Sequence, residues 1–132
     1  MSSILIVDDS RTDTYVAKKC AEVLFTEVHS THDVAGLLRV LSEVRPSLIT
    51  MDVNLFDWQN GISLIAEIRD GQDENSIIPI VVISSRSTPA DKNIAMDAGA
   101  SAYIVKPVTV EQLEKVAQDF IPGYARPLPR GT

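Results

Sequence analysis

The chain has 132 residues, of which 45% are hydrophobic and 23% are charged, a composition typical of one globular domain with a buried core. Eighteen acidic residues against twelve basic ones give a formal net charge of −6, so we expect no binding of nucleic acid by this domain. A single cysteine, Cys20, excludes an internal disulfide, and no apolar stretch approaches the roughly 20 residues that span a bilayer. These features favour a cytoplasmic protein with no membrane contact.

The first part of the chain reads as a strand followed by two amphipathic helices. The apolar run at 4–7 predicts a buried strand. Ser10 is suited to cap the next helix, with Asp13 three residues further on, and apolar residues between 16 and 24 form one stripe. A second stripe between 34 and 44 has the same helical spacing. These runs are the first elements of a pattern in which strands and helices alternate along the whole chain.

The rest of the chain continues the alternation. Further strands are predicted at 47–51, 80–83 and 102–105, and helices at 61–70, 89–98 and 110–120, with a polar loop through Asn75. Thr109 and Gln112 form a capping box for the last helix. Five strand–helix units predict an α/β fold in which a parallel sheet has helices on both faces. We expect residues 1–121 to fold as the domain. Residues 122–132, with three prolines and two glycines, are expected to form a flexible tail or a truncated linker.

Polar side chains follow four of the predicted strands, at the point where each strand ends. Asp8 and Asp9 come after the first strand, Asp52 after the run at 47–51, Ser84 after the next, and Lys106 after the last. In an open parallel sheet, ligands bind outside the carboxyl ends of the strands. We therefore expect these side chains to converge on one small cleft. Taken singly, each also has an ordinary interpretation, such as an acid near a helix start or a serine in a turn.

This set of groups favours a divalent cation and a phosphoryl group. Adjacent carboxylates raise one another's pKa unless a cation lies between them, and Mg²⁺ prefers hard oxygen ligands. With the charge partly neutralised, Asp52 can act as a nucleophile toward a phosphoryl donor. The Lys106 ammonium and the Ser84 hydroxyl would then bind two phosphoryl oxygens.

These motifs resemble the receiver domain of two-component response regulators, in the CheY-like superfamily, over residues 3 to about 121. The resemblance implies a flavodoxin-like (βα)5 fold, a doubly wound parallel sheet with strand order 2-1-3-4-5. It also implies phosphoryl transfer to Asp52 from a histidine kinase or a histidine phosphotransfer protein. Mg²⁺ would be held by Asp9, Asp52 and the backbone carbonyl of Asn54, while Asp8 would act mainly through a water. Such a domain is a phosphoacceptor in signalling and not an enzyme, apart from catalysing its own phosphorylation and dephosphorylation.

The resemblance also implies a switch. Ser84 moves toward the acyl phosphate in such domains, Tyr103 turns inward, and the face formed by helix 4, strand 5 and helix 5 carries the signal. Asn54 and Arg86 match positions that set the lifetime of the phosphate. The peptide bond before Pro107 is commonly cis in this family, which aims the preceding lysine into the cleft.

One segment departs from the family pattern. Receivers commonly have proline where Phe56 stands, and their glycine comes one residue earlier than Gly61. The loop is therefore expected to be longer and less rigid. Phe56 and Trp58 either close over the cleft, dock a partner or pack on the third helix, and the sequence does not choose among these.

Three functions remain open from the sequence. The domain either acts alone, docking an unidentified partner protein or passing its phosphate on, or forms the N-terminal part of a larger regulator. A third interpretation is a haloacid-dehalogenase-like phosphatase, which uses the same groups around Mg²⁺. There a second aspartate usually stands two residues after the nucleophile, and here that residue is Asn54. A phosphorylation-dependent dimer is compatible with the receiver interpretation, but the sequence does not decide it.

Overall fold

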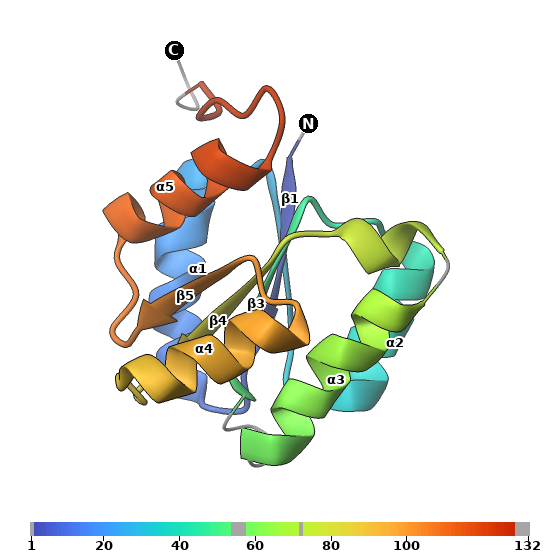
Figure 1. The fold of residues 1–132 in the computed structure, drawn as a ribbon. Coiled ribbons are helices and arrows are strands. Elements are labelled where there is room, and N and C mark those ends of the chain that lie inside the picture. The colour runs from blue at the N-terminus through green and yellow to red at the C-terminus, as the bar shows by residue number, and fades with distance from the viewer. Residues whose placement is uncertain (1, 54–57, 72, 129–132) are drawn as a thin grey trace.

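The computed structural model describes residues 2–53, 58–71 and 73–128. Strands and helices alternate through these residues (Figure 1). The elements are β1 (Ser3–Val7), α1 (Arg11–Leu24), β2 (Glu27–Thr31), α2 (Val34–Glu43), β3 (Leu48–Met51), α3 (Trp58–Asp70), η2 (Glu74–Ile77), β4 (Ile80–Ser84), α4 (Pro89–Ala98), β5 (Ala102–Val105) and α5 (Val110–Phe120).

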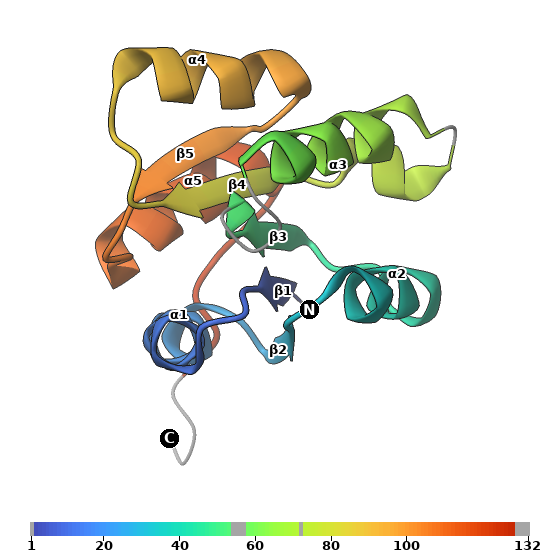
Figure 2. The same ribbon diagram turned by 90° about the horizontal axis from the view of Figure 1, so that it is seen from below.

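The five strands form one parallel sheet in the order β2-β1-β3-β4-β5. The chain starts near the middle of the sheet, winds outward to β2, and then crosses back over β1 to build the other half. Figure 2 shows the sheet between two layers of helices, with α1 and α5 on one face and α2 and α3 on the other. The α/β fold class and the strand order 2-1-3-4-5 are confirmed.

Two hydrophobic cores lie on opposite faces of the sheet because side chains alternate along each strand. In β1, Ile4 and Ile6 pack with α1 and α5, whereas Leu5 and Val7 pack with α2 and α3. The central strands β1, β3 and β4 are buried over their whole length, as expected for parallel strands covered on both faces. This burial fixes the strands, and therefore the positions of the residues that follow them.

The edge strand β2 was not identified in the sequence, because it lacks a continuous apolar run. Its residues are exposed or partly buried except the last, Thr31, which is buried. Pairing with β1 holds it in the sheet, with Ser3 opposite Glu27 and Val7 opposite Thr31. A polar strand of this kind is typical of a protected sheet edge.

The helix ends follow the predicted capping pattern with one exception. The Ser10 hydroxyl accepts a hydrogen bond from the Asp13 amide, and the capping box of Thr109 and Gln112 is formed. α4 ends at Gly99, which has φ +118° in the left-handed region that favours glycine. α3 begins at Trp58, three residues before the predicted start, so that prediction was wrong. No helix in the described part of the chain is long and apolar enough to cross a membrane.

Residues after α5 return toward the start of β1 (Figure 1) and contact the end of α1. The Tyr124 hydroxyl donates to the Leu24 carbonyl at 2.7 Å, and its ring lies 5.8 Å from the ring of Phe25. Arg126 donates two hydrogen bonds to Glu114 on α5. The described part of the C-terminal segment, up to residue 128, is therefore joined to the domain at two points.

Candidate functional site

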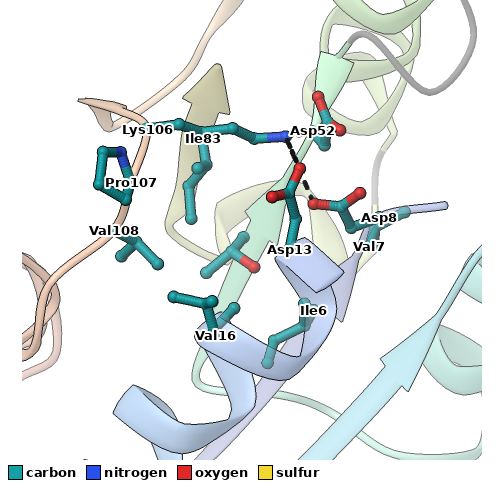
Figure 3. Close-up of a pocket in the computed structure, with 12 residues that line it drawn as sticks. Ile6, Val7, Asp8, Asp13, Val16, Asp52, Ile83, Lys106, Pro107 and Val108 are labelled. Atoms are coloured by element: carbon teal, nitrogen blue, oxygen red, sulfur yellow. Dashed lines mark hydrogen bonds and ion pairs between the residues drawn. The ribbon is translucent and has the colours of Figure 1, made fainter. Parts of the chain in front are cut away.

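Three of the predicted residues meet at the carboxyl end of the sheet (Figure 3). Asp8 follows β1, Asp52 follows β3, and Lys106 follows β5. The Lys106 Nζ atom lies 3.1 Å from Asp52 Oδ2 and 3.6 Å from Asp8 Oδ2. The side chains of Asp8 and Asp52 are only 7% and 5% exposed. The residues converge because their strands are neighbours in the sheet and end together.

A fourth residue of the site, Asp13, was not identified in the sequence as part of it. Its Oδ2 atom lies 2.7 Å from Lys106 Nζ, and oxygens of Asp8, Asp13 and Asp52 all lie within 4.8 Å of one another. Asp13 stands at the third position of α1, where helical side chains lean back toward the helix N-terminus. That direction points toward the end of β1. The position of Asp13 in the first turn of the helix could therefore have indicated its place in the site, but the prediction considered only residues that follow strands.

Asp9 takes a different position from its neighbour Asp8. It is exposed, and it does not belong to the carboxylate group that the structure brings together among the described residues. Asp9 lines an open hollow beside Tyr15 and His32, which Asp8 also borders. The two adjacent acids therefore differ, one buried against the lysine and one at the rim.

Backbone hydrogen bonds hold the two buried carboxylates in place. The Asp52 amide donates to the Val7 carbonyl at 3.0 Å, and the Asp8 amide donates to the Thr31 carbonyl at 3.1 Å. Asp8 Oδ1 accepts from the Ser10 amide at 2.9 Å. The sheet ladder thus extends one residue past β1 and β3, so these side chains are fixed by the sheet.

Gly61 permits a close approach between α3 and the residue that follows Asp52. A Cβ atom at position 61 would lie 2.7 Å from both the Cβ and the carbonyl oxygen of Val53. Real side chains do not reach such distances from backbone atoms. Glycine is therefore needed here because the helix packs directly on the chain beside the candidate site.

Burial and charge shift the protonation of the site. Burial raises the pKa of Asp8 to about 6, with a further contribution from the charge of Asp52. Burial opposes the charge of Lys106, yet its hydrogen bonds to Asp13 and Asp52 raise its pKa above the ordinary value. The ammonium lies closer to Asp13 and Asp52 than to Asp8. A cation bound beside Asp8 would lower its pKa again and favour its ionised form.

Ser84, Tyr103 and Arg86 lie together on the β4–β5 side of the site. Ser84 is fully buried, and its hydroxyl accepts a hydrogen bond from the Arg86 amide at 3.1 Å. The Tyr103 hydroxyl donates to the Arg86 carbonyl at 2.8 Å. The Arg86 side chain lies 3.6 Å from Asp91 at the start of α4. One short segment thus joins β4, β5 and α4.

The backbone connects this segment to the lysine. The Lys106 amide donates to the Ser84 carbonyl at 2.9 Å, and the Lys106–Pro107 peptide bond is cis. Roles were predicted from the sequence for Asn54, Phe56 and Trp58. Asn54, Phe56 and the side chain of Trp58 lie outside the described part of the structure. Their predicted roles therefore stay predictions.

The chain matches the family described as "Response regulator receiver domain" over residues 4–118, which is most of its length. The chain belongs to this family. The transcriptional regulatory protein KdpE of Escherichia coli is 32% identical over 115 residues, covering 86% of this chain and 48% of that protein. PrrA of Mycobacterium leprae is 30% identical over 110 residues, covering 83% of this chain and 46% of that protein. The receiver domain described here thus spans about half the length of these curated relatives.

Solved structures have the same fold. The chemotaxis response regulator CheY4 of Vibrio cholerae superposes with a TM-score of 0.77 and 26% identity, covering 91% of this chain and 98% of that one. The signal receiver domain of a histidine kinase from Syntrophus aciditrophicus superposes with a TM-score of 0.78 and 25% identity over the whole of both chains. The chain is therefore a signalling domain and not a classical enzyme.

Proposed function

We propose that this receiver domain is a phosphoacceptor in which Asp52 takes a phosphoryl group from a phosphohistidine of a histidine kinase or a histidine phosphotransfer protein. The observation that carries this proposal is the buried Asp52 carboxylate 3.1 Å from the Lys106 ammonium. In the transfer, a bond forms between an Asp52 oxygen and phosphorus. The bond from phosphorus to the histidine nitrogen breaks, and the imidazole leaves with the electron pair.

The donor set fits Mg²⁺, which is the cation that the family implies. Asp8 and Asp52 belong to a group of three carboxylates within 4.8 Å of one another, and they supply hard oxygen ligands of the kind that Mg²⁺ prefers. The third member, Asp13, is the nearest partner of Lys106, and burial raises the pKa of Asp8, so a bound cation would favour its ionised form. When bound, Mg²⁺ would neutralise charge on the transferring oxygens. Asp8, Asp9 and Asp52 are the residues of this chain that we assign to it, together with the backbone carbonyl of Asn54.

Lys106 has two tasks in this proposal. It holds the Asp52 carboxylate through the 3.1 Å contact before transfer, and it binds a phosphoryl oxygen afterwards. Ser84 supplies a hydroxyl to another oxygen from the neighbouring strand. Its move would withdraw the acceptor of the Arg86 amide and disturb the contact between Tyr103 and Arg86. This chain of contacts supports a population shift at the α4–β5–α5 face as the output.

Phosphorylation by a small donor tests the proposal. With acetyl phosphate and Mg²⁺, the intact mass of the wild-type domain should rise by one phosphate, and Asp52→Asn should show no rise. A label that maps to a residue other than Asp52 would refute the assignment. Continuous release of phosphate from a phosphomonoester would revive the haloacid-dehalogenase-like alternative, which the family match disfavours.

A second experiment tests the switch. Amide NMR signals of α4 and β5 should shift when wild type is phosphorylated, and these shifts should be much smaller in Lys106→Ala at equal phosphorylation. Equal shifts in the two proteins would show that Lys106 does not link the phosphate to this face. Binding to a partner protein or dimerisation would use the α4–β5–α5 face. An output domain would be attached after residue 132.

A further inference from the structure

The Lys106 ammonium has more carboxylate partners than the proposed reaction needs. Its shortest contact is 2.7 Å to Asp13, followed by 3.1 Å to Asp52 and 3.6 Å to Asp8. The ammonium donates hydrogen bonds to Asp13 and Asp52, and it forms a longer ion pair with Asp8. A phosphoryl oxygen on Asp52 would therefore compete with these carboxylates for the ammonium and its three N–H donors.

Asp13 is the partner best placed to be replaced. Its side chain is 41% exposed, whereas those of Asp8 and Asp52 are almost fully buried. It projects from the first turn of α1, and the other two follow strands of the sheet (Figure 3). An exposed carboxylate regains hydration when it loses the lysine, and a buried one does not.

An acid in the first turn of a helix is by itself an ordinary feature, because it interacts favourably with the helix dipole. The N-cap contact between Ser10 and the Asp13 amide would be the same with any residue at position 13. Neither fact accounts for the direct contact with an ammonium that comes from β5, 93 residues away in sequence. The ion pair is the observation that a purely helical role leaves unexplained.

We propose that Asp13 is a positioning residue for Lys106, which holds the ammonium at the mouth of the site until a phosphoryl group on Asp52 displaces it. The inference rests on the proposed phosphoacceptor function. It adds that Asp13 competes with the phosphoryl group for the Lys106 ammonium. Asp13 slows phosphorylation in two ways. It occupies a donor of the lysine, and it places a negative charge near the entering anionic donor.

The matched variants are Asp13→Asn, which removes the charge at nearly constant shape, and Asp13→Glu, which keeps it. Glu111→Gln is the control, since it removes an acid from the first turn of α5 and leaves the site untouched. With acetyl phosphate and Mg²⁺, Asp13→Asn should be phosphorylated about tenfold faster than wild type, corresponding to about 1.4 kcal/mol. Asp13→Glu and Glu111→Gln should stay within about twofold of wild type.

A second measurement separates positioning from simple repulsion. The side-chain ε-CH₂ NMR signals of Lys106 in the unphosphorylated domain should shift in Asp13→Asn and not in Glu111→Gln. Faster phosphorylation with unchanged Lys106 signals would overturn the inference, because the charge would then act on the donor directly. Mg²⁺ affinity by calorimetry should fall less than about fivefold, since losing even a residue that only supports a metal ligand typically costs about tenfold or more. A larger fall would make Asp13 a metal ligand instead.

The outcomes also distinguish this inference from the proposed function. If neither wild type nor Asp13→Asn gains phosphate on Asp52, the phosphoacceptor function itself fails. If both gain it at the same rate, or if Asp13→Asn gains it more slowly, the function stands and the role of Asp13 is refuted.

Discussion

Replacing Asp8 by Asn should stabilise the domain at neutral pH when no divalent cation is present. Asp8 is buried beside Asp52, and its pKa rises from 3.8 to about 6 on folding. Because the folded state binds the proton more tightly, Asp8 favours folding in its protonated form and opposes it when ionised. Stability should therefore fall as pH rises from about 4 to about 6 and stay low above that range.

The size of the effect follows from the shift. A difference of roughly two pKa units at 1.36 kcal/mol each gives an upper limit of about 3 kcal/mol. The net shift already includes the attraction of the Lys106 ammonium, 3.6 Å away, which lowers the pKa of Asp8. We expect a gain of about 1–2 kcal/mol in the free energy of unfolding at pH 7.5.

Urea unfolding in EDTA across about pH 4 to pH 8 measures this directly. Relative to Asp8→Asn, wild type should lose stability between about pH 4 and pH 6. Asp97→Asn is the control, because it removes an exposed carboxylate from α4 and matches the change in net charge. Added Mg²⁺ should then stabilise wild type more than Asp8→Asn by mass action. A wild-type stability that does not fall relative to Asp8→Asn over this range, or a less stable Asp8→Asn at pH 7.5, would refute the reasoning.

Three further substitutions test the packing of the fold, one beside the site and two away from it. Gly61→Ala should lower the free energy of unfolding by about 1–3 kcal/mol, since its Cβ would meet the Val53 backbone; unchanged urea midpoints would contradict this close packing. Arg69→Lys should cost about 1–3 kcal/mol, because its guanidinium donates to three backbone carbonyls and a serine hydroxyl that an ammonium cannot reach together. Tyr124→Phe should cost about 1 kcal/mol through the lost bond to the Leu24 carbonyl; hydrogen exchange that is unchanged at the end of α1 would show that this bond is not formed in solution.

The site residues whose convergence could be predicted from the sequence share one property: each directly follows a strand with an apolar run. Asp8, Asp52 and Lys106 could be predicted because parallel strands carry their ends to one edge, whatever lies between them in the chain. The apolar runs of β1, β3 and β4 could be recognised because strands covered on both faces are continuously hydrophobic, and the edge strand β5, which is only partly buried, still has a short apolar run. Local pattern and topology are enough for this part of the site.

The features that could not be predicted from the sequence depend on contacts between distant segments. β2 has no apolar run, and its place at the sheet edge comes from pairing with β1. From the sequence alone, Asp13 is an ordinary acidic residue near a helix start. Its contact with Lys106 exists only because α1 packs on the sheet. The docking of Tyr124 on α1 joins residues 100 positions apart. No local periodicity encodes these contacts, because each requires the assembled fold.

The charges at the strand ends suit the site to a reversible modification. Three carboxylates against one ammonium leave an excess of two negative charges when all are ionised, which a divalent cation would balance. A dianionic phosphoryl group on Asp52 would then restore the excess of negative charge. Lys106 is the basic residue that already contacts these carboxylates and can pair with the phosphoryl group. Its long side chain can turn from Asp13 to a phosphoryl oxygen while its backbone stays bonded to Ser84. The change of state would therefore begin as an exchange of ion-pair partners, and the buried sheet would keep its position throughout.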